Sequence, residues 1–308
     1  MIRVKDLAYV RFRAPDLDLA ERFLSDFGLT RSARTETALY MRPADAVHHA
    51  YVAELGPPKF IGFAFEADAL DDLKALSSAE TASAVAPIEE PGGGARVVLT
   101  DPDGFQVEVV HGIERPAPLS PSATNLYNWG SERTRLGNAK RLERGPAIVK
   151  RLGHVVIITT DFQRSDAFYK AHFGLISSDE IYRDDEPERT MMAFSRVDRG
   201  GDYVDHHTLA AMEGPAAAFH HAAFEVENFD SVLLGHEHLK AQGYEHALGV
   251  GRHVLGSQIF DYWLDPWGRR LEHWADGDLL NKASGTARAP LSVAMGRQWG
   301  PTVPDRRG

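Results

Sequence analysis

The chain contains no cysteine among its 308 residues. Disulfide bonds, cysteine-ligated zinc and thiol catalysis are therefore excluded. It also lacks a run of 18 apolar residues, and its start, Met1–Asp6, has no apolar signal core, so we expect a cytoplasmic protein with no membrane partner. The 34 Lys and Arg residues are outnumbered by 44 Asp and Glu residues. A net charge of -10 argues against a nucleic-acid partner, because phosphate binding requires concentrated positive charge.

Histidine, in contrast, is well represented and unevenly placed. Of 14 histidines, three precede residue 150, namely His48, His49 and His111. Histidine is the commonest metal ligand and the side chain that titrates near neutral pH. The asymmetry suggests that the second half of the chain carries chemistry and the first half does not.

The two halves of the sequence resemble each other in three blocks. In order along the chain, residues 7–12 with 27–29 match 152–157 with 173–175, residues 63–67 match 222–226, and residues 101–108 match 265–272. The shared order and spacing indicate an internal duplication. Within each half, a strand-like run, an amphipathic helix and several short strands follow one another twice. We therefore predict an α+β fold of four βαβββ modules.

The composition also predicts where the halves meet. Residues 116–147 are rich in Pro, Ser, Gly and Arg and have no apolar periodicity, which is typical of a linker. We expect a first domain over residues 1–115 and a second over 148–282. Residues 283–308 have the same character as the linker and are expected to form an extended tail over the surface.

Three residues of the second half suit a metal site. His154 and His221 each open an apolar, strand-like run, and Glu272 closes the run that follows a turn. The gaps of 67 and 51 residues mean that only a fold can bring them together. Two imidazoles and one carboxylate on one face of a divalent metal leave about three coordination positions open, an arrangement used by non-heme Fe(II) oxygenases.

The duplication provides an internal comparison for this site. The positions of the first half that match His154 and His221 are Tyr9 and Gly62, and Glu108 alone keeps its counterpart's residue type. We therefore predict that the first half binds no metal.

On these residues the chain resembles the two-domain type I extradiol ring-cleaving dioxygenases, the catechol 2,3-dioxygenase-like members of the vicinal oxygen chelate superfamily. The resemblance covers residues 3–280 and is strongest over 150–275. It implies that the modules pair into two incomplete barrels, the glyoxalase-like fold. It also implies that the second barrel is catalytic and holds Fe(II), or Mn(II), through the three ligands above.

Three further residues match acid-base positions of that family. By resemblance, His207 is the histidine beside bound dioxygen, while His253 and Tyr262 act on the substrate's oxygens. Adjacent residues of a strand point to opposite faces, so His206 and His220 are alternatives to His207 and to the ligand at position 221.

The resemblance implies a reaction as well as a fold. The expected activity is extradiol cleavage of a substituted catechol, with incorporation of both atoms of O2 and release of a hydroxymuconate-type product, in aromatic hydrocarbon catabolism (class EC 1.13.11). The expected partners are the catechol, O2 and further copies of the chain in a homo-oligomer. The alternatives are a metal-dependent isomerase or lyase of the same superfamily, and a protein that binds a small aromatic compound without catalysis.

Overall fold

The computed structural model describes residues 1–119 and 126–301. The first half contains β1 (Asp6–Ala14), α1 (Leu17–Asp26), β2 (Thr30–Arg34), β3 (Ala38–Arg42), β4 (Tyr51–Leu55), β5 (Lys59–Glu66), α2 (Leu70–Leu76), β6 (Ala86–Pro87), β7 (Ala95–Thr100) and β8 (Gln106–His111). The second half contains β9 (Val149–Thr159), α3 (Phe162–Phe173), β10 (Ile176–Arg183), β11 (Glu186–Arg196), β12 (Val204–Asp205), β13 (Leu209–Glu213), β14 (Ala218–Val226), α4 (Phe229–Ala241), β15 (His246–His253), β16 (Ile259–Leu264), β17 (Arg270–Ala275) and β18 (Leu279–Leu280). The 3-10 helix η1 (Lys282–Ser284), β19 (Ala287–Pro290), α5 (Leu291–Ala294) and β20 (Arg297–Trp299) follow.

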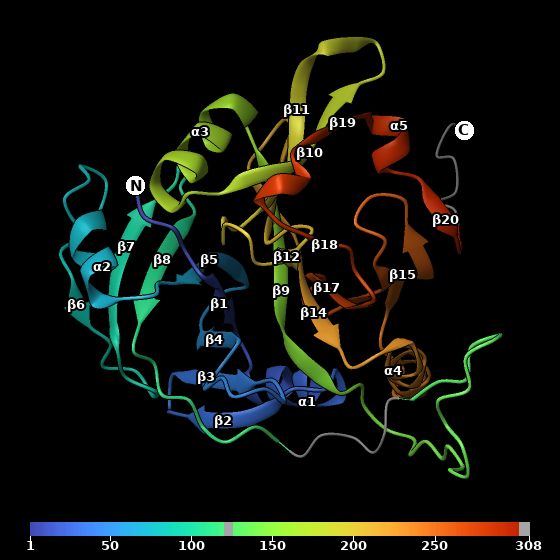
Figure 1. The fold of residues 1–308 in the computed structure, drawn as a ribbon. Helices are drawn as coiled ribbons and strands as arrows, with labels where there is room; N and C mark the ends of the chain where they lie inside the picture. The colour runs from blue at the N-terminus through green and yellow to red at the C-terminus, as the bar shows by residue number, and fades with distance from the viewer. Residues whose placement is uncertain (120–125, 302–308) are drawn as a thin grey trace.

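The strands form two large, curved sheets that lie side by side (Figure 1). The first has the order β2-β3-β4-β1-β5-β8-β7-β6, and the core of the second repeats it as β10-β11-β13-β9-β14-β17-β16-β15. Each sheet therefore joins two βαβββ modules through the first strand of each module, as predicted. No helix in the described part of the chain is long and apolar enough to span a membrane.

Local sequence signals explain where the helices begin and end. Asp16 and Asp161 precede α1 and α3, and each carboxylate accepts a hydrogen bond from a backbone N–H of the first turn. These bonds satisfy donors that have no partner within the helix. Helix α3 ends at Gly174, whose φ of 69° is left-handed and readily adopted by glycine.

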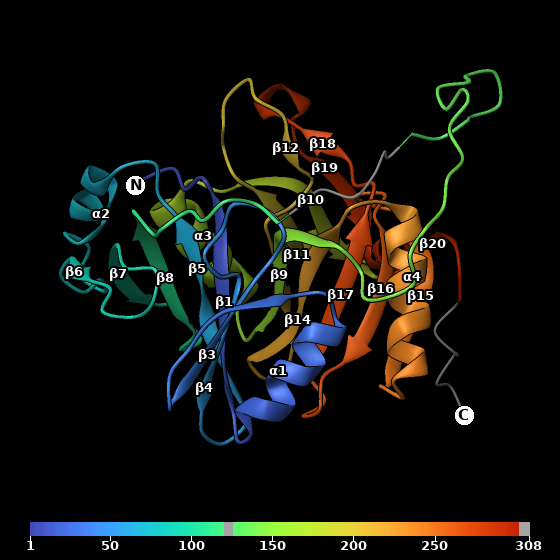
Figure 2. The ribbon, with the colours of Figure 1, turned by 90° about the horizontal axis from the view of Figure 1, so that it is seen from below.

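One hydrophobic core joins the two halves. The contacts that join them come in pairs: the ring of Phe27 packs on Phe224, and the ring of Phe173 packs on Phe65. Phe27 follows α1 of the first half, and Phe224 lies on β14 of the second. Phe173 ends α3 of the second half, and Phe65 lies on β5 of the first. In Figure 2, α1 lies across the region where the two sheets meet. The internal duplication thus extends to the packing between the halves.

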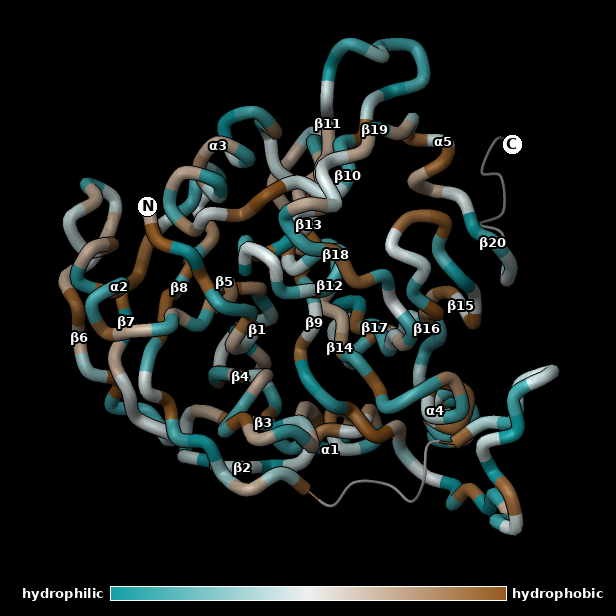
Figure 3. Tube along the Cα trace, in the orientation of Figure 1, coloured by the Kyte–Doolittle hydropathy of each residue, from teal (hydrophilic) through white to brown (hydrophobic). Residues whose placement is uncertain are grey.

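Polar residues gather where the chain leaves this core. Figure 3 shows hydrophilic residues at the tip of the hairpin between β10 and β11, which projects from the body of the molecule. The described parts of the predicted linker contain no helix or strand, and one isolated bridge joins Asn128 and Arg133. Residues 120–125 of the linker and 302–308 of the tail lie outside the described residues. The domain boundaries and the homo-oligomer stay predictions.

The tail differs from the extended segment that we expected over the surface. Strand β19 pairs with β10 at one edge of the second sheet, and β20 pairs with β15 at the opposite edge. Helix α5 connects them. The tail therefore crosses from one edge of the incomplete barrel to the other, and its backbone bonds are satisfied by both edge strands.

Candidate metal and catalytic site

Four strands of the second sheet, β9, β14, β17 and β16, carry four of the six predicted residues, namely His154, His221, Glu272 and Tyr262. In the strand register, Ala223 of β14 lies between His154 of β9 on one side and Glu272 of β17 on the other. Glu272 in turn lies opposite Tyr262 of β16. His221 lies two residues before Ala223, on the same face of β14. The small side chain of Ala223 leaves space between the first histidine and the carboxylate.

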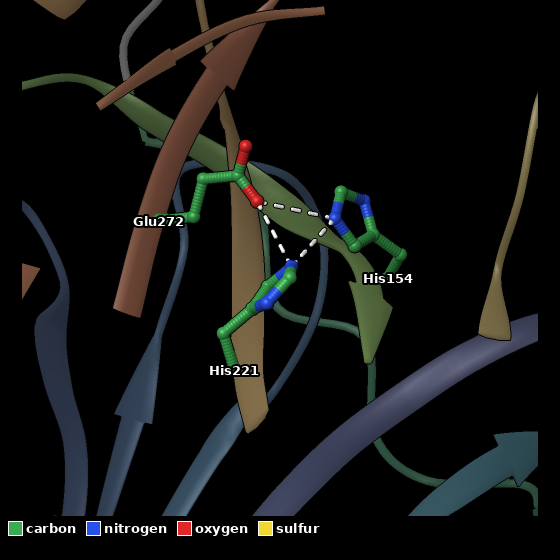
Figure 4. Close-up of side chains that lie close together, drawn as sticks. All are labelled: His154, His221 and Glu272. Atoms are coloured by element: carbon green, nitrogen blue, oxygen red, sulfur yellow. Dashed lines mark hydrogen bonds and ion pairs between the residues drawn. The ribbon is translucent and has the colours of Figure 1, made fainter. Parts of the chain in front are cut away.

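The three predicted ligands converge on one another (Figure 4). Nε2 of His154 and Nε2 of His221 each lie 3.2 Å from Oε2 of Glu272. The two nitrogens are 3.3 Å apart. A point equidistant from the three atoms lies about 1.9 Å from each of them, close to the ~2.0–2.2 Å bond length of a divalent metal such as zinc.

Burial and charge at this site suit a cation. Glu272 is fully buried, and its second oxygen, Oε1, has no hydrogen-bond partner. Burial acts to raise the pKa of this carboxyl, but bonds from the two histidines outweigh it and hold the pKa below its ordinary value. Burial lowers the pKa of His221, which keeps that imidazole neutral. A neutral imidazole and an ionised carboxylate are the forms that bind a metal, so the residues fit one.

His207 lies beside this group, after β12 and before β13. Its ring is 4.1 Å from the ring of His154, and it is almost fully buried. Burial, reinforced by the neighbouring histidines, lowers the pKa of His207 far below the ordinary value. The adjacent His206 is bound instead to Asp179, with its Nε2 2.6 Å from the carboxylate.

The alternation of neighbouring residues fails at the other histidine pair. We expected His220 and His221 to point to opposite faces, but both line the same cavity. A shift in strand register between Phe219 and His221 breaks the simple alternation there. Nε2 of His220 lies 3.2 Å from Nη1 of Arg270, so His220 takes part in the wall of the cavity rather than in the ligand group.

His253 and Tyr262 form a hydrogen-bonded pair. Nε2 of His253 lies 3.0 Å from the Tyr262 hydroxyl and 3.8 Å from Oε1 of Glu272. Burial lowers the pKa of His253 to about 4. Burial, together with the negative charge of Glu272, raises the pKa of Tyr262 well above its ordinary value. At neutral pH the pair therefore consists of a neutral imidazole and a protonated phenol.

A cavity of about 470 Å³ opens directly onto these groups. Its wall includes residues that sequence reasoning missed, because they come from strands, loops and the tail: Val156, Met192, Phe194, Met212, Leu248, Leu255, Gln258, Arg270, Ala294, Met295 and Arg297. Most of this wall is apolar, as is usual where a small molecule binds. The tail contributes the last three of these residues.

The equivalent position in the first sheet holds an arginine instead of a metal group. Tyr9 and Arg11 both contact Glu108, at 2.9 Å from the hydroxyl and 3.0 Å from Nε. Arg11 also binds Glu54 and Glu90. The carboxylate that matches Glu272 is thus already paired with a guanidinium. That the first half binds no metal stays a prediction.

Comparisons with known proteins identify the family of the chain. The family model for the Glyoxalase/Bleomycin resistance protein/Dioxygenase superfamily matches residues 6–109 and again 151–273, one match in each half. Metapyrocatechase 2 of Cupriavidus necator is 34% identical over 98% of this chain and 91% of its own length. The iron-dependent extradiol dioxygenase of Rhodococcus jostii (strain RHA1) is 24% identical, with 96% of each chain covered.

Solved structures share the fold. Homoprotocatechuate 2,3-dioxygenase from Brevibacterium fuscum, in its anaerobic complex with 3,4-dihydroxyphenylacetate, matches with a TM-score of 0.79 and 21% identity, covering 98% of this chain and 91% of its own. The Mn(II)-bound glyoxalase from Novosphingobium aromaticivorans matches with a TM-score of 0.78 and 22% identity, covering 99% and 94%. The chain belongs to the Glyoxalase/Bleomycin resistance protein/Dioxygenase superfamily and, within it, to the extradiol dioxygenases.

Proposed function

We propose that this protein is an Fe(II)-dependent enzyme that cleaves a substituted catechol beside its vicinal hydroxyls, incorporating both atoms of O2 and releasing a hydroxymuconate-type product. The observation that carries the proposal is the meeting of three candidate ligand atoms, within 3.3 Å of one another, at a cavity that His207, His253 and Tyr262 also line. The family and its metapyrocatechase relative support the same reaction.

His154, His221 and Glu272 would hold the metal on one face and leave the other face to the cavity. When bound, the metal supplies Lewis acidity and an electron path between the catechol and dioxygen. Two nitrogens and one carboxylate suit Fe(II) and Mn(II) alike. We favour iron because a relative over nearly the whole chain is described as iron-dependent, and Mn(II) is the alternative.

Tyr262 and His253 would act on the hydroxyls of the catechol. The Tyr262 phenol stays protonated and can donate a hydrogen bond to a catechol oxygen. The neutral His253, 3.0 Å from that phenol, can take up the proton that the catechol gives up on binding. Histidine is the side chain that most often acts as a general base in enzymes.

His207 would act on the opposite side, where dioxygen reacts. We assign the hydrogen of a neutral His206 ring to Nε2, which lies against the Asp179 carboxylate, and this makes Nδ1 of His206 an acceptor. Nδ1 of His207, 3.0 Å away, then donates to it. This leaves Nε2 of His207 available to accept a proton from the reactants and to return it later.

The cavity wall indicates the class of substituent. Methionine, leucine and phenylalanine side chains form most of the surface around the ligand group, so an apolar ring substituent would be desolvated favourably there. The same wall keeps bulk water from the reacting atoms.

The proposal is tested by loading the protein with Fe(II) without oxygen, adding a methyl-substituted catechol and then admitting O2. We expect a yellow ring-opened product only after O2 is present. The matched substrate control is the same catechol with one hydroxyl methylated, which cannot offer two metal-binding oxygens and should give no product. Product formation without O2 would instead indicate an isomerase or lyase, and binding without any product would indicate a binding protein.

A further inference from the structure

A second group of two imidazoles and one carboxylate lies on the other side of the same sheet. His236 is on α4, His246 opens β15, and Asp261 is on β16. Helix α4 packs against both strands (Figure 2). None of the three residues lines the cavity described above, so this group is separate from the catalytic site.

The ligand atoms of this group are close enough to share one ion. Nε2 of His246 lies 2.8 Å from Oδ1 of Asp261, and Nδ1 of His236 lies 3.2 Å from the same oxygen. The three atoms all lie within 4.8 Å of one another. In a tetrahedral site with bonds of ~2.0–2.1 Å, neighbouring ligand atoms are about 3.3 Å apart, so a metal would draw any wider pair of these atoms closer by at most about 1.5 Å.

The orientation of the carboxylate is fixed from behind. The indole Nε1 of Trp263 donates to Oδ2 of Asp261 at 2.6 Å, and the indole ring packs against both imidazoles. Oδ1 faces His246, and Nδ1 of His236 lies 3.2 Å from both oxygens of the carboxylate. Outer hydrogen bonds of this kind orient the ligands of metal sites in proteins.

The duplication shows that the fold itself does not need this carboxylate. In the second sheet, Tyr262 lies opposite Glu272, and Asp261 is the residue before Tyr262. In the first sheet, Val98 lies opposite Glu108, the counterpart of Glu272, so the residue before it, Val97, matches Asp261. Val97 and Asp261 are both fully buried. An apolar residue therefore fills this position in one copy, while the other copy carries a buried charge, which is costly unless it is well paired.

The two histidines are also particular to the second copy. His246 lies opposite Trp263 on the neighbouring strand, and the matching bridge in the first half joins Ala82 to Leu99. His236 lies eight residues after Asn228, which caps the start of α4. Eight residues after Ala69, the matching cap of α2, the first half has Ser77. Serine, alanine and valine in one copy are thus replaced by histidine, histidine and aspartate in the other.

From this replacement and the distances above, we propose that His236, His246 and Asp261 bind a divalent transition metal such as Zn²⁺. Two imidazole nitrogens and one carboxylate oxygen favour zinc, cobalt, nickel or copper over calcium and magnesium, which prefer all-oxygen sites. The imidazoles keep 22% and 31% of their side-chain surface exposed. The ion can therefore enter from solvent and complete its coordination with water.

A metal at this site would tie helix α4 to the hairpin of β15 and β16. The far end of that hairpin carries His253, and Tyr262 directly follows Asp261 on the opposite face of β16. Binding would therefore stabilise the element that presents this pair to the cavity. The proposal depends on neither the identity of the catalytic metal nor the ring-cleavage reaction.

The test uses the iron-loaded protein, dialysed with a modest excess of Zn²⁺ and then analysed for both metals and for its melting temperature. We expect one zinc per chain with the iron retained, and a melting temperature raised by a few degrees, because a ligand of the folded state stabilises it. His246→Gln and Asp261→Asn should each weaken zinc binding at least about tenfold and abolish the rise. His238→Gln, on the same helix but bound to Asp26, is the matched control and should bind zinc normally.

Three outcomes would overturn the proposal. Zinc could fail to bind, it could displace the iron one for one, or it could bind as well to His246→Gln as to the unaltered protein. Asp261 is fully buried and its replacement could unfold the chain, whereas His246 is partly exposed. The His246→Gln variant therefore decides the question by itself.

Discussion

At the scale of single residues, the two halves neutralise equivalent buried carboxylates in different ways. Glu108 has the guanidinium of Arg11 within 3.0 Å, whereas Glu272 has two imidazole nitrogens and an oxygen without a partner. A buried carboxylate with incomplete pairing is costly, and a bound cation would remove that cost. The difference explains why one barrel has a fixed internal cation and the other has room for a metal.

Replacing Glu272 with glutamine tests this directly. The amide has the same shape but no charge, so Glu272→Gln should fold yet lose iron and, with it, activity. Iron content by elemental analysis and turnover of a catechol would be measured together. Glu108→Gln is the matched control from the first half and should keep its iron. Full iron content in Glu272→Gln would show that the carboxylate is not a ligand.

His207→Gln separates proton transfer from metal binding. The variant should keep its iron and still bind catechol, because His207 is outside the ligand group, but turnover should fall by about 10²–10⁴-fold, the usual contribution of an acid-base residue. Iron analysis and stopped-flow kinetics would be compared with those of His172→Gln, the replacement of a histidine on α3 that does not line the cavity. Near-normal turnover would exclude the proposed role.

The convergence of His154, His221 and Glu272 could be predicted from sequence, since each lies at a recognisable place in a repeated strand pattern. The direction of the His220 side chain could not be predicted, because an irregularity in strand register between Phe219 and His221 breaks the alternation of neighbouring side chains. The different surroundings of His206 and His207 could not be predicted either. Nε2 of His206 lies against the Asp179 carboxylate, 27 residues earlier, whereas the ring of His207 lies beside that of His154 and lines the cavity.

At the scale of secondary-structure elements, the helix ends are where the two halves fit together. Gly174 and Gly28 both have positive φ. A Cβ at Gly174 would meet the backbone oxygen of Ile2, before the first strand of the first half, and a Cβ at Gly28 would meet that of Ala147, before the first strand of the second half. The backbone of Ile2 also donates to the carbonyl of His172. These glycines therefore allow close approach as well as a left-handed turn.

Gly174→Ala should destabilise the protein by more than the left-handed conformation alone requires. That conformation costs an alanine about 1–2 kcal/mol. A Cβ at Gly174 would also come within 2.7 Å of the Ile2 carbonyl oxygen. Gly200→Ala is the matched control, since its φ of 66° is nearly the same and a Cβ there would meet nothing within 4 Å. Denaturant unfolding of both variants would give the difference, and equal losses would contradict the packing argument.

The order of modules and the start and end of α3 could be predicted, because capping residues and repeated blocks are local signals. The tail could not. Its strands β19 and β20 are short and lack a clear alternating pattern, and they exist because two edge strands, β10 and β15, offer unpaired backbone groups. Long-range pairing of this kind leaves little trace in the sequence of either partner.

At the scale of the whole molecule, buried neutral histidines make stability depend on pH. His49, in the first half and away from the ligand group, is 3% exposed. Burial, with help from the neighbouring His48 and Arg11, lowers its pKa to about 3. An unfolded chain takes up the proton near pH 6.5. Each pH unit below 6.5 therefore favours unfolding by about 1.4 kcal/mol through this residue, until the pH approaches 3.

His49→Phe should reduce this acid sensitivity. Phenylalanine keeps a ring against Tyr9 and Tyr40 but has no proton to gain. The free energy of unfolding would be measured between pH 7 and pH 4.5 for both proteins. The unaltered protein should lose more stability over that interval than the variant. Equal slopes would show that His49 does not stay neutral in the folded state.

The internal duplication gives one molecule two sheets of the same strand order that surround different residues. Ring cleavage is proposed for the second. The most direct test is oxygen consumption by the iron-loaded protein given a known amount of a methyl-substituted catechol. One O2 should be consumed for each catechol as the yellow product forms, since both oxygen atoms enter the product. A protein that is fully loaded with iron and binds the catechol, yet takes up no oxygen, would contradict the proposed function.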